Sequence, residues 1–380
     1  MKQGWEIKKL GEVANILNGY AFDSKLFSED SNDVPLIRIR DIKRGYTETF
    51  YKGDFSEEYI IRKGDYLIGM DGEFNIAEWK GENALLNQRV CKIITNKIVD
   101  RYLFWYMPIV LKQIEDATPF VTVKHLSSKQ LINTTIPIPP REEQERIVEE
   151  LDCLSGVIEK KREQLRELDA LAQSIFYQMF GDPITNEKGW EVKKIKEVFS
   201  VKIGPFGSLL HNSDYISGGT PLVNPIHMHN ERICPDFDFS VSDDKLKELR
   251  NYILRTNDIV LARRGDIGRC AIVGVNEDGY LCGTGSLFMR PTTGINSNFI
   301  IKQIRCNSMI EYLTSLAKGA TMLNINCKIV EELNFILPPI SLQQEFADKI
   351  EAIEKQKALI KQSIAETETL FNARMDYYFN

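Results

Sequence analysis

Residues 4–13 read GWEIKKLGEV, and residues 189–198 read GWEVKKIKEV. Seven of these ten positions are identical at an offset of 185 residues. A second pair of segments is similar at an offset of 199 residues, IPIPPREEQERI at 136–147 and FILPPISLQQEF at 335–346. Because proline restricts the residue before it and cannot continue strand pairing, each Pro-Pro pair predicts the end of an extended segment. The chain is therefore an internal repeat with matching opening and closing sequences.

A heptad pattern follows each proline pair, with apolar side chains at alternating steps of four and three. In the first stretch these are Ile147, Leu151, Leu154, Ile158, Leu165, Leu168, Ala172, Ile175 and Met179. In the second stretch they are Phe346, Ile350, Ile353, Ile360, Ile364, Phe371 and Tyr378. Polar residues interrupt both seams, namely Lys161 in the first and Lys357, Thr367 and Arg374 in the second. Gly181 and Pro183 predict the end of the first helix.

Each seam predicts a helix of about 38 residues, which would extend roughly 57 Å at 1.5 Å per residue. A long helix with one apolar stripe needs a surface that covers the stripe. We expect the two helices to pair with each other in antiparallel orientation, because the chain alternates between domain and helix. The alternative is that each helix packs on its own globular domain.

These patterns predict an α+β (mixed α/β) fold with two globular domains in a pseudo-twofold repeat, separated by two long antiparallel coiled-coil helices. The predicted domains are 1–139 and 183–337, and the predicted helical spacers are 140–182 and 338–380. The offset grows from 185 to 199 residues, so the second domain carries about 14 extra residues. A shared framework with different contents is typical of a molecule that presents two different binding surfaces.

Composition limits the class of protein. The net charge is −6, but 1–139 carries 19 basic and 19 acidic side chains and 183–337 carries 18 and 17. The acidic excess therefore lies in the spacers, and either domain can have a basic face. Seven scattered cysteines without a CxxC pair favour reduced thiols in a cytoplasmic protein and argue against structural zinc. The start has no signal sequence, and the apolar run at 102–111 is too short for a membrane span.

The paired G-W-x-x-x-x-L/I-x-E-V and P-P-x-x-x-Q-x-x-I/F motifs resemble those of the specificity subunits of type I restriction–modification enzymes. Further matches are IGPFGS at 203–208, RRGDIGR at 263–269 and the two domain closings at 122–140 and 322–339. The resemblance covers essentially the whole chain. It implies two target-recognition domains, each of which reads one half of a bipartite asymmetric DNA sequence as part of phage defence.

The resemblance also implies the partners. They are double-stranded DNA, two methyltransferase subunits docked on the helical spacers, and a restriction and motor subunit, with no membrane. S-adenosylmethionine is expected on the methyltransferase, and this chain is expected to hold no cofactor and no metal. Adenine-DNA methyltransferase and endonuclease activities would belong to the assembled complex.

The sequence contains few candidate catalytic motifs. The nearest string to a methyltransferase motif is NPIH at 224–227, which lacks the second proline and the aromatic residue. Asp236, Asp243 and Lys245 suggest a nuclease site, but a solvated acidic loop has the same composition. We expect no catalysis. Two alternatives are an enzyme with a fused recognition half, and a coiled-coil protein-assembly adaptor without sequence-selective DNA binding.

DNA binding requires cations for phosphates and amide or guanidinium groups for base edges. In the first domain we expect these contacts from Arg38 and Arg40 on one strand face, and from Lys43, Arg44, Asn87, Gln88, Arg89 and Lys124. In the second domain we expect them from Phe206, Ser208, Arg263, Arg264, Arg269, Lys318 and Asn324. For each residue the alternative is a solvated charge or a salt bridge, for example to Asp41 or Asp266.

Overall fold

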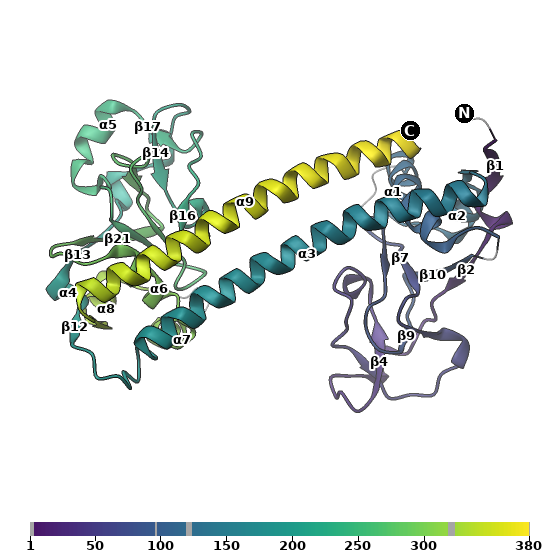
Figure 1. The fold of residues 1–380 in the computed structure, drawn as a ribbon, viewed down its shortest axis with the longest axis horizontal. Coiled ribbons are helices and arrows are strands. Elements are labelled where there is room, and N and C mark those ends of the chain that lie inside the picture. Colours follow the sequence, from purple (N-terminus) through teal and green to yellow (C-terminus); the bar gives the residue numbers. More distant parts are fainter. Residues whose placement is uncertain (1–3, 96, 119–123, 318–323, 380) are drawn as a thin grey trace. The chain divides into compact units, whose positions relative to one another are not determined.

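The structure is a computed structural model that describes residues 4–95, 97–118, 124–317 and 324–379. The chain divides into two compact units (Figure 1). Unit 1 contains Met1–Lys160 and Ser363–Asn380, and unit 2 contains Lys161–Gln362. Both units combine β-sheets with helices, as the predicted fold class requires. The predicted domain boundaries at 139, 182 and 337 stay a prediction.

Unit 1 contains two larger sheets, with strand orders β2-β10-β7-β8 and β3-β5-β4-β9-β6, and the separate pair β1-β11. The strands are β1 (Glu6–Lys9), β2 (Ala14–Asn18), β3 (Phe27–Ser28), β4 (Val34–Ile37), β5 (Phe50–Tyr51), β6 (Ile60–Ile61), β7 (Tyr66–Gly69), β8 (Asn75–Glu78), β9 (Ala84–Leu86), β10 (Val90–Thr95) and β11 (Thr135–Ile138). The helices are α1 (Asp100–Ala117) and α2 (Ser128–Asn133), with short 3₁₀ helices η1 (Leu10–Glu12), η2 (Ser24–Leu26), η3 (Ile39–Asp41) and η4 (Glu57–Tyr59).

Unit 2 has sheets of order β13-β21-β18-β19 and β17-β14-β20, and the pairs β12-β22 and β15-β16. The strands are β12 (Val192–Lys194), β13 (Phe199–Ile203), β14 (Thr220–Val223), β15 (Met228–His229), β16 (Arg232–Ile233), β17 (Ser240–Val241), β18 (Ile259–Ala262), β19 (Cys270–Ile272), β20 (Leu281–Cys282), β21 (Ser286–Pro291) and β22 (Asn334–Ile336). The helices are α4 (Ile195–Val198), α5 (Asp243–Glu248), α6 (Ser297–Ile304), α7 (Asn307–Leu316) and α8 (Cys327–Glu331), with η5 (Gly207–Leu209), η6 (Asn212–Asp214), η7 (Pro225–His227) and η8 (Arg250–Tyr252).

The repeated sequences form the same element in both units. The opening strand β1 pairs antiparallel with the closing strand β11, and Lys8 lies opposite Ile136. In unit 2 the opening strand β12 pairs antiparallel with β22, and Val192 lies opposite Ile336. The four-stranded sheets also have the same order, and the parallel pair β14-β20 repeats the parallel pair β4-β9. The internal repeat therefore encodes a common framework.

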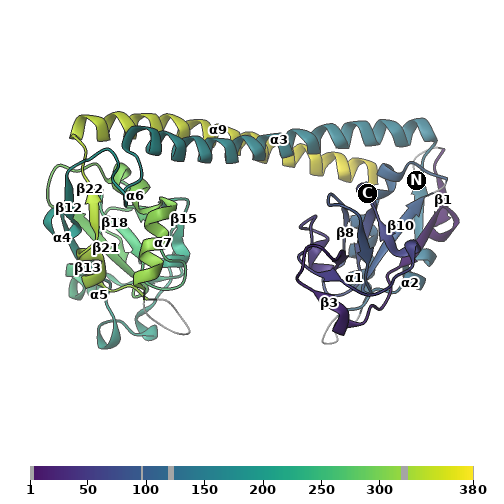
Figure 2. The same ribbon diagram turned by 90° about the horizontal axis from the view of Figure 1, so that it is seen from below.

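A helix of 40 residues follows each closing strand, α3 (Arg141–Phe180) and α9 (Ile340–Phe379). Within unit 1, Arg374 Nη2 donates to Glu150 Oε2 at 2.9 Å. Within unit 2, Lys357 Nζ lies 2.7 Å from Asp169 Oδ1. Residue numbers rise along α3 as they fall along α9, so the helices are antiparallel within each unit, as predicted (Figure 2). Arg374 and Lys357, two of the polar residues that interrupt the second seam, therefore form ion pairs with α3. Such pairs are suited to fixing the register of two helices.

All of the predicted seam residues are buried or half-buried. Ile147 and Leu151 belong to the same core as the sheet and helix α1 of unit 1. Ala172, Phe176 and Phe346 likewise join the domain core of unit 2. In these parts of the seams the helices pack on a domain core as well as on each other, so the predicted helix pairing is combined with packing on the domains.

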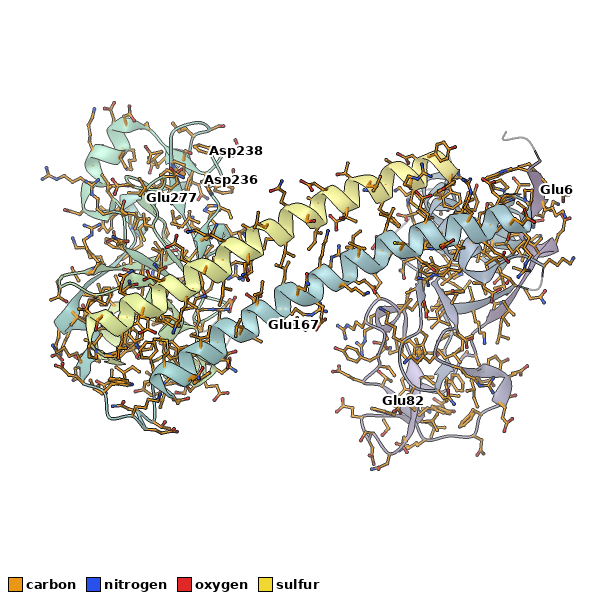
Figure 3. The ribbon with its side chains drawn as sticks, viewed as in Figure 1. Glu6, Glu82, Glu167, Asp236, Asp238 and Glu277 are labelled. Atoms are coloured by element: carbon orange, nitrogen blue, oxygen red, sulfur yellow. The ribbon has the colours of Figure 1, made fainter. Side chains whose placement is uncertain are left out.

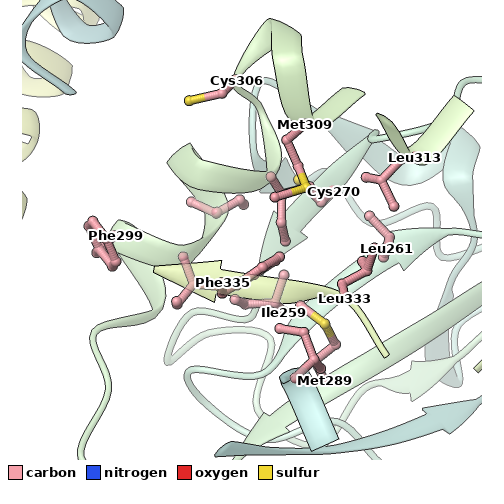
Figure 4. Packing of buried hydrophobic residues seen from close by; sticks show 14 of the residues in the cluster. Ile259, Leu261, Cys270, Met289, Phe299, Cys306, Met309, Leu313, Leu333 and Phe335 are labelled. Carbon is pink, nitrogen blue, oxygen red and sulfur yellow. The ribbon is translucent and has the colours of Figure 1, made fainter. Parts of the chain in front are cut away.

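Four phenylalanines connect the long helices to the core of unit 2. The Phe176 ring stacks on Phe299 of α6 with the ring centroids 5.8 Å apart, and it meets Phe180 at 5.3 Å and Phe346 at 5.6 Å. Phe299 belongs to the same buried apolar cluster as Leu261 of β18 and Leu313 of α7 (Figure 4). Phe176 is 1% exposed.

A buried glutamine begins each long helix and explains the repeated P-P-x-x-x-Q motif. Gln144 Oε1 accepts a hydrogen bond from Val99 N at 2.8 Å, and its Nε2 donates to Pro139 O at 2.8 Å. Gln343 does the same in unit 2, with Asn296 N at 3.1 Å and Pro338 O at 2.8 Å. Each glutamine thus ties the start of its helix to the backbone of its own domain.

Replacement of Gln343 by alanine is expected to lower the free energy of unfolding by about 1–3 kcal/mol, because a buried N–H and a buried C=O lose their partner. Urea denaturation of the full chain measures this. The control is Gln344→Ala at the adjacent exposed position, where the loss of two exposed hydrogen bonds, to Asn296 and Asp348, is expected to change the free energy of unfolding by at most about 0.5 kcal/mol. Equal effects at both positions would contradict the proposed tie.

Candidate nucleic-acid interface

Five loops of unit 2 are joined by backbone hydrogen bonds into one surface, which we call the second loop edge (204–208, 224–227, 263–269, 283–285 and 324–326). Four bonds at 2.9–3.0 Å make the connections, from Gly204 N to Ser286 O, Gly283 N to Val223 O, Arg263 N to Gly285 O and Ile325 N to Arg263 O. The loops follow strands β13, β14, β18 and β20 and precede helix α8. The structure therefore gathers residues that lie up to about 120 positions apart in the sequence.

Glycine permits the closest approach within this edge. A Cβ on Gly204 would lie 2.0 Å from the carbonyl oxygen of Gly283, and a Cβ on Gly283 would lie 2.2 Å from Asn224 Oδ1. Any other residue would push the loops apart. The IGPFGS and GTGS segments therefore serve as packing points between loops.

The three arginines predicted to bind DNA have different surroundings. Arg263 Nη1 donates to Thr284 O at 3.3 Å, and burial, followed by repulsion from Arg264, lowers the pKa of the Arg263 guanidinium. Arg269 Nε donates to Asp266 Oδ2 at 2.9 Å, and its Nη1 donates to Pro225 O at 3.2 Å. Arg264 is exposed, and among the described residues its side chain forms no ion pair or hydrogen bond. Of the three, Arg264 is the most accessible to a phosphate.

The other predicted residues of the second domain have separate positions. Phe206 is 55% exposed, and Ser208 is also exposed beside it. Asn324 lies opposite Arg264 in an isolated β-bridge, and its Oδ1 is buried without a partner among the described residues. Lys318 lies outside the described residues. Apart from Lys318, the second-domain predictions fall on one edge of unit 2.

Unit 1 has an equivalent surface, which we call the first loop edge (19–22, 38–45, 70–73, 87–89 and 124–126). Gln88 N donates to Tyr20 O at 2.8 Å, and Leu126 N donates to Met70 O at 2.7 Å. The second of these bonds matches the one between Ile325 and Arg263. A Cβ on Gly19 would lie 2.0 Å from Asn87 O, which repeats the approach of Gly204 to Gly283.

The predicted strand face with Arg38 and Arg40 is wrong. Strand β4 ends at Ile37, and the two arginines enter the 3₁₀ helix η3. The Asp41 carboxylate, which is 2% exposed, accepts a hydrogen bond from Arg38 N at 2.9 Å and turns the chain. Both arginine side chains are exposed on the first loop edge, and Arg40 Nε lies 3.7 Å from Asp41 Oδ1.

The remaining first-domain residues differ in accessibility. Gln88 and Arg44 are exposed, and Lys43 is exposed but forms an ion pair with Glu73 at 2.9 Å. Asn87 is only 6% exposed and its Oδ1 accepts a hydrogen bond from Gln88 N, so its side chain serves the turn. Lys124 Nζ donates to Glu115 O at 2.7 Å.

Arg89 belongs to a small polar cluster on the first loop edge. Its Nη1 lies 3.4 Å from Asp71 Oδ1 and 3.2 Å from His125 Nδ1, and the Asp71 and His125 side chains are 2.5 Å apart. Arg89 has a φ of 74°, a strained value for a residue with a side chain. The strain is consistent with a side chain held in a defined direction.

Sequence reasoning missed the two residues that shape the turn after the parallel pair. In unit 2 the buried His227 takes the place of Asp41, and its Nδ1 lies 3.3 Å from Asn224 N and 2.7 Å from Leu222 O. The spacing of three residues between Arg38 and Asp41, and between Asn224 and His227, was a usable signal for a side-chain cap. The parallel pairs β4-β9 and β14-β20 occupy the same place in the two units, and their register aligns Arg38 with Asn224 and Arg40 with Ile226.

The acidic segment considered as a nuclease site lies on the exterior of unit 2 (Figure 3). Asp236 Oδ1 accepts a hydrogen bond from Asp238 N at 3.0 Å, which closes a turn. Lys245 Nζ lies 3.1 Å from Glu248 and 3.5 Å from Asp214. The structure accounts for these groups as turn and surface contacts.

Known proteins share this organisation. The family described as type I restriction modification DNA specificity domain matches residues 2–169 and again 187–369. The EcoBI specificity subunit of Escherichia coli is 30% identical, over 93% of this chain and 81% of its own length. The MjaVIII specificity subunit of Methanocaldococcus jannaschii is 22% identical over 93% and 86%. The chain therefore belongs to the family of type I restriction–modification DNA specificity subunits.

Solved structures agree on the fold. The crystal structure of a type I S subunit from M. genitalium has a TM-score of 0.57 at 13% identity, covering 99% of this chain and 96% of that one. A structure from a study of complex assembly in the type I system has a TM-score of 0.56 at 20% identity, covering 99% and 97%. Family membership assigns this chain the DNA-recognition role rather than a catalytic one. Among the described helices, none has the length and apolar character needed to cross a membrane.

Proposed function

We propose that the two loop edges read the two halves of a bipartite, asymmetric DNA target. The observation that carries the proposal is that one framework presents different side chains at matched positions. The pairs are Arg38 and Asn224, Arg40 and Ile226, Asp71 and Arg264, and His125 and Asn324. Two identical edges would favour a palindromic target, whereas two unlike edges favour unlike half-sites.

The exposed groups on the edges suit duplex DNA. Arg40 and Arg264 are suited to phosphates or to guanine edges, and Gln88 is suited to adenine. Loops that are joined by backbone hydrogen bonds hold such groups in fixed positions, which base readout requires. Because the domains are nearly neutral overall, we expect weak nonspecific binding in isolation.

The partners belong to the same proposal. We infer that α3 and α9 dock two methyltransferase subunits, which would hold S-adenosylmethionine, and that a restriction and motor subunit joins the complex. The assembled complex would methylate adenine and cleave DNA in the cytoplasm, and this chain would contribute recognition without catalysis.

Mapping of methylated bases in the genome of cells that carry this chain and its methyltransferase tests the proposal. We expect one motif with two unlike halves and a fixed gap. Exchange of residues 14–135 for the same segment of another specificity subunit is expected to change one half only. An active methyltransferase that yields no such motif would contradict DNA reading and would favour the protein-assembly adaptor.

A further inference from the structure

Ile226 and Phe206 are the two large apolar side chains exposed on the second loop edge, and Ile226 is the more exposed of the two. It is 68% exposed, whereas its neighbours His227 and Met228 are 4% and 2% exposed. The side chain therefore projects from the turn η7 and contributes little to the core. Isolated exposed apolar residues are common on protein surfaces, so exposure alone does not assign Ile226 a role.

The backbone of this turn is fixed on several sides. Pro225 occupies the first position of η7 and restricts its own φ. The buried His227 ring contacts Asn224 N, and Asn224 Oδ1 accepts a hydrogen bond from Gly285 N at 3.1 Å. Arg269 Nη1 donates to Pro225 O at 3.2 Å. Ile226 is thus held in place on both sides by neighbouring loops.

The surroundings of Ile226 are those of a DNA-reading surface rather than an apolar docking site. The Arg269 guanidinium donates a hydrogen bond to the carbonyl oxygen of Pro225, the residue directly before Ile226. Arg263 contacts the adjoining 283–285 loop, because its Nη1 donates to Thr284 O and its backbone N donates to Gly285 O. The matched position in unit 1 is Arg40, whose guanidinium is suited to guanine or to a phosphate. An isoleucine at that position cannot do either. In the major groove the group that an apolar side chain distinguishes is the 5-methyl of thymine.

We propose that Ile226 is a specificity-determining residue that contacts a thymine methyl group in the half-site read by unit 2. This inference rests on the proposed function. At this position the two loop edges differ in chemical character, because unit 1 presents the polar Arg40 and unit 2 presents the apolar Ile226.

The test uses the complex of this chain with its methyltransferase and a duplex of the mapped motif. Each thymine of the unit 2 half-site is replaced in turn by uracil, which lacks only the methyl group. Equilibrium binding at fixed salt is expected to weaken about fourfold at one position, which corresponds to about 0.8 kcal/mol for one buried methyl group. Ile226→Ala is expected to abolish that difference, and Ile226→Val to retain part of it.

Arg40→Ala is the matched control, because it alters the equivalent position in unit 1. It is expected to leave unchanged the ratio of thymine to uracil binding in the half-site that unit 2 reads. A half-site without an A·T pair, equal binding of all uracil duplexes, or a preference that survives Ile226→Ala would each overturn the inference. In all three cases the mapped motif persists, so the proposed function stands. Absence of any motif would remove both.

Discussion

Replacement of Phe176 by alanine is expected to lower the free energy of unfolding by about 3–5 kcal/mol. The side chain is 1% exposed and its ring contacts those of Phe180, Phe299 and Phe346. Its removal leaves a cavity where α3, α6 and α9 meet in unit 2. Because rigid aromatic neighbours fill such a cavity poorly, we expect an effect near the upper end of the range.

Urea denaturation gives the total loss of stability, and amide hydrogen exchange locates it. Exchange is expected to accelerate in α6 and in the last turns of α3, and to remain near its original rate in α1 of unit 1. Leu171→Ala is the matched control on the same helix, since Leu171 is 47% exposed and a change of at most about 0.5 kcal/mol is expected. A loss at Leu171 as large as that at Phe176 would show that the aromatic cluster does not set the cost, since alanine is the better helix former at both positions.

The heptad pattern predicted the seam well but missed Phe176 and Phe180. A seam of a and d positions describes a helix that meets one partner helix, whereas α3 also packs on a domain core. A helix with two neighbouring surfaces buries a wider stripe, and the additional residues lie beside the seam. The sequence does contain this wider stripe, but only the fold shows that a second surface covers it.

The repeat predicted which residues of the two halves correspond, without explaining why. Gln144 and Gln343 were visible as a shared motif, but their partners Val99 and Asn296 lie 45 and 47 residues away. No local pattern indicates such a partner. The motif could therefore be predicted as structural, while its mechanism required the tertiary fold.

The predicted DNA-contact residues were harder to place. Alternation in IRIR suggested a strand, but the carboxylate of Asp41 bonds Arg38 N and ends the strand early. Asn87 and Lys124 have suitable side chains for DNA, yet they hydrogen-bond within unit 1. Composition identifies groups that are able to bind DNA, whereas accessibility depends on partners that the sequence does not reveal.

Joint replacement of Arg263 and Arg264 by alanine is expected to weaken binding of the target duplex by the complex and to flatten its salt dependence. Each phosphate contact contributes about 0.9 to the slope of log K against log salt, so the loss of two lowers the slope by about 2. Over a threefold rise in salt, that difference alone corresponds to about an eightfold change in relative affinity.

The two arginines are expected to act differently within this effect. Arg264→Ala alone should reduce the slope by about 1, because we propose that this exposed guanidinium contacts one phosphate. Arg263→Ala removes the bond to Thr284 O, so it should also loosen the 283–285 loop and reduce discrimination between related sequences.

Arg255→Ala is the control for charge alone, since Arg255 precedes β18 whereas Arg263 and Arg264 follow it. We expect it to leave the slope unchanged, because Arg255 lies at the opposite end of the strand and pairs with Asp278 at 3.5 Å. Binding measured from about 50 to 200 mM salt, a range over which affinity that depends on phosphate contacts falls steeply, decides between the outcomes. An unchanged affinity and slope in the double variant would remove both arginines from the interface. A slope that falls equally with Arg255→Ala would show that net charge, not the second loop edge, draws the duplex.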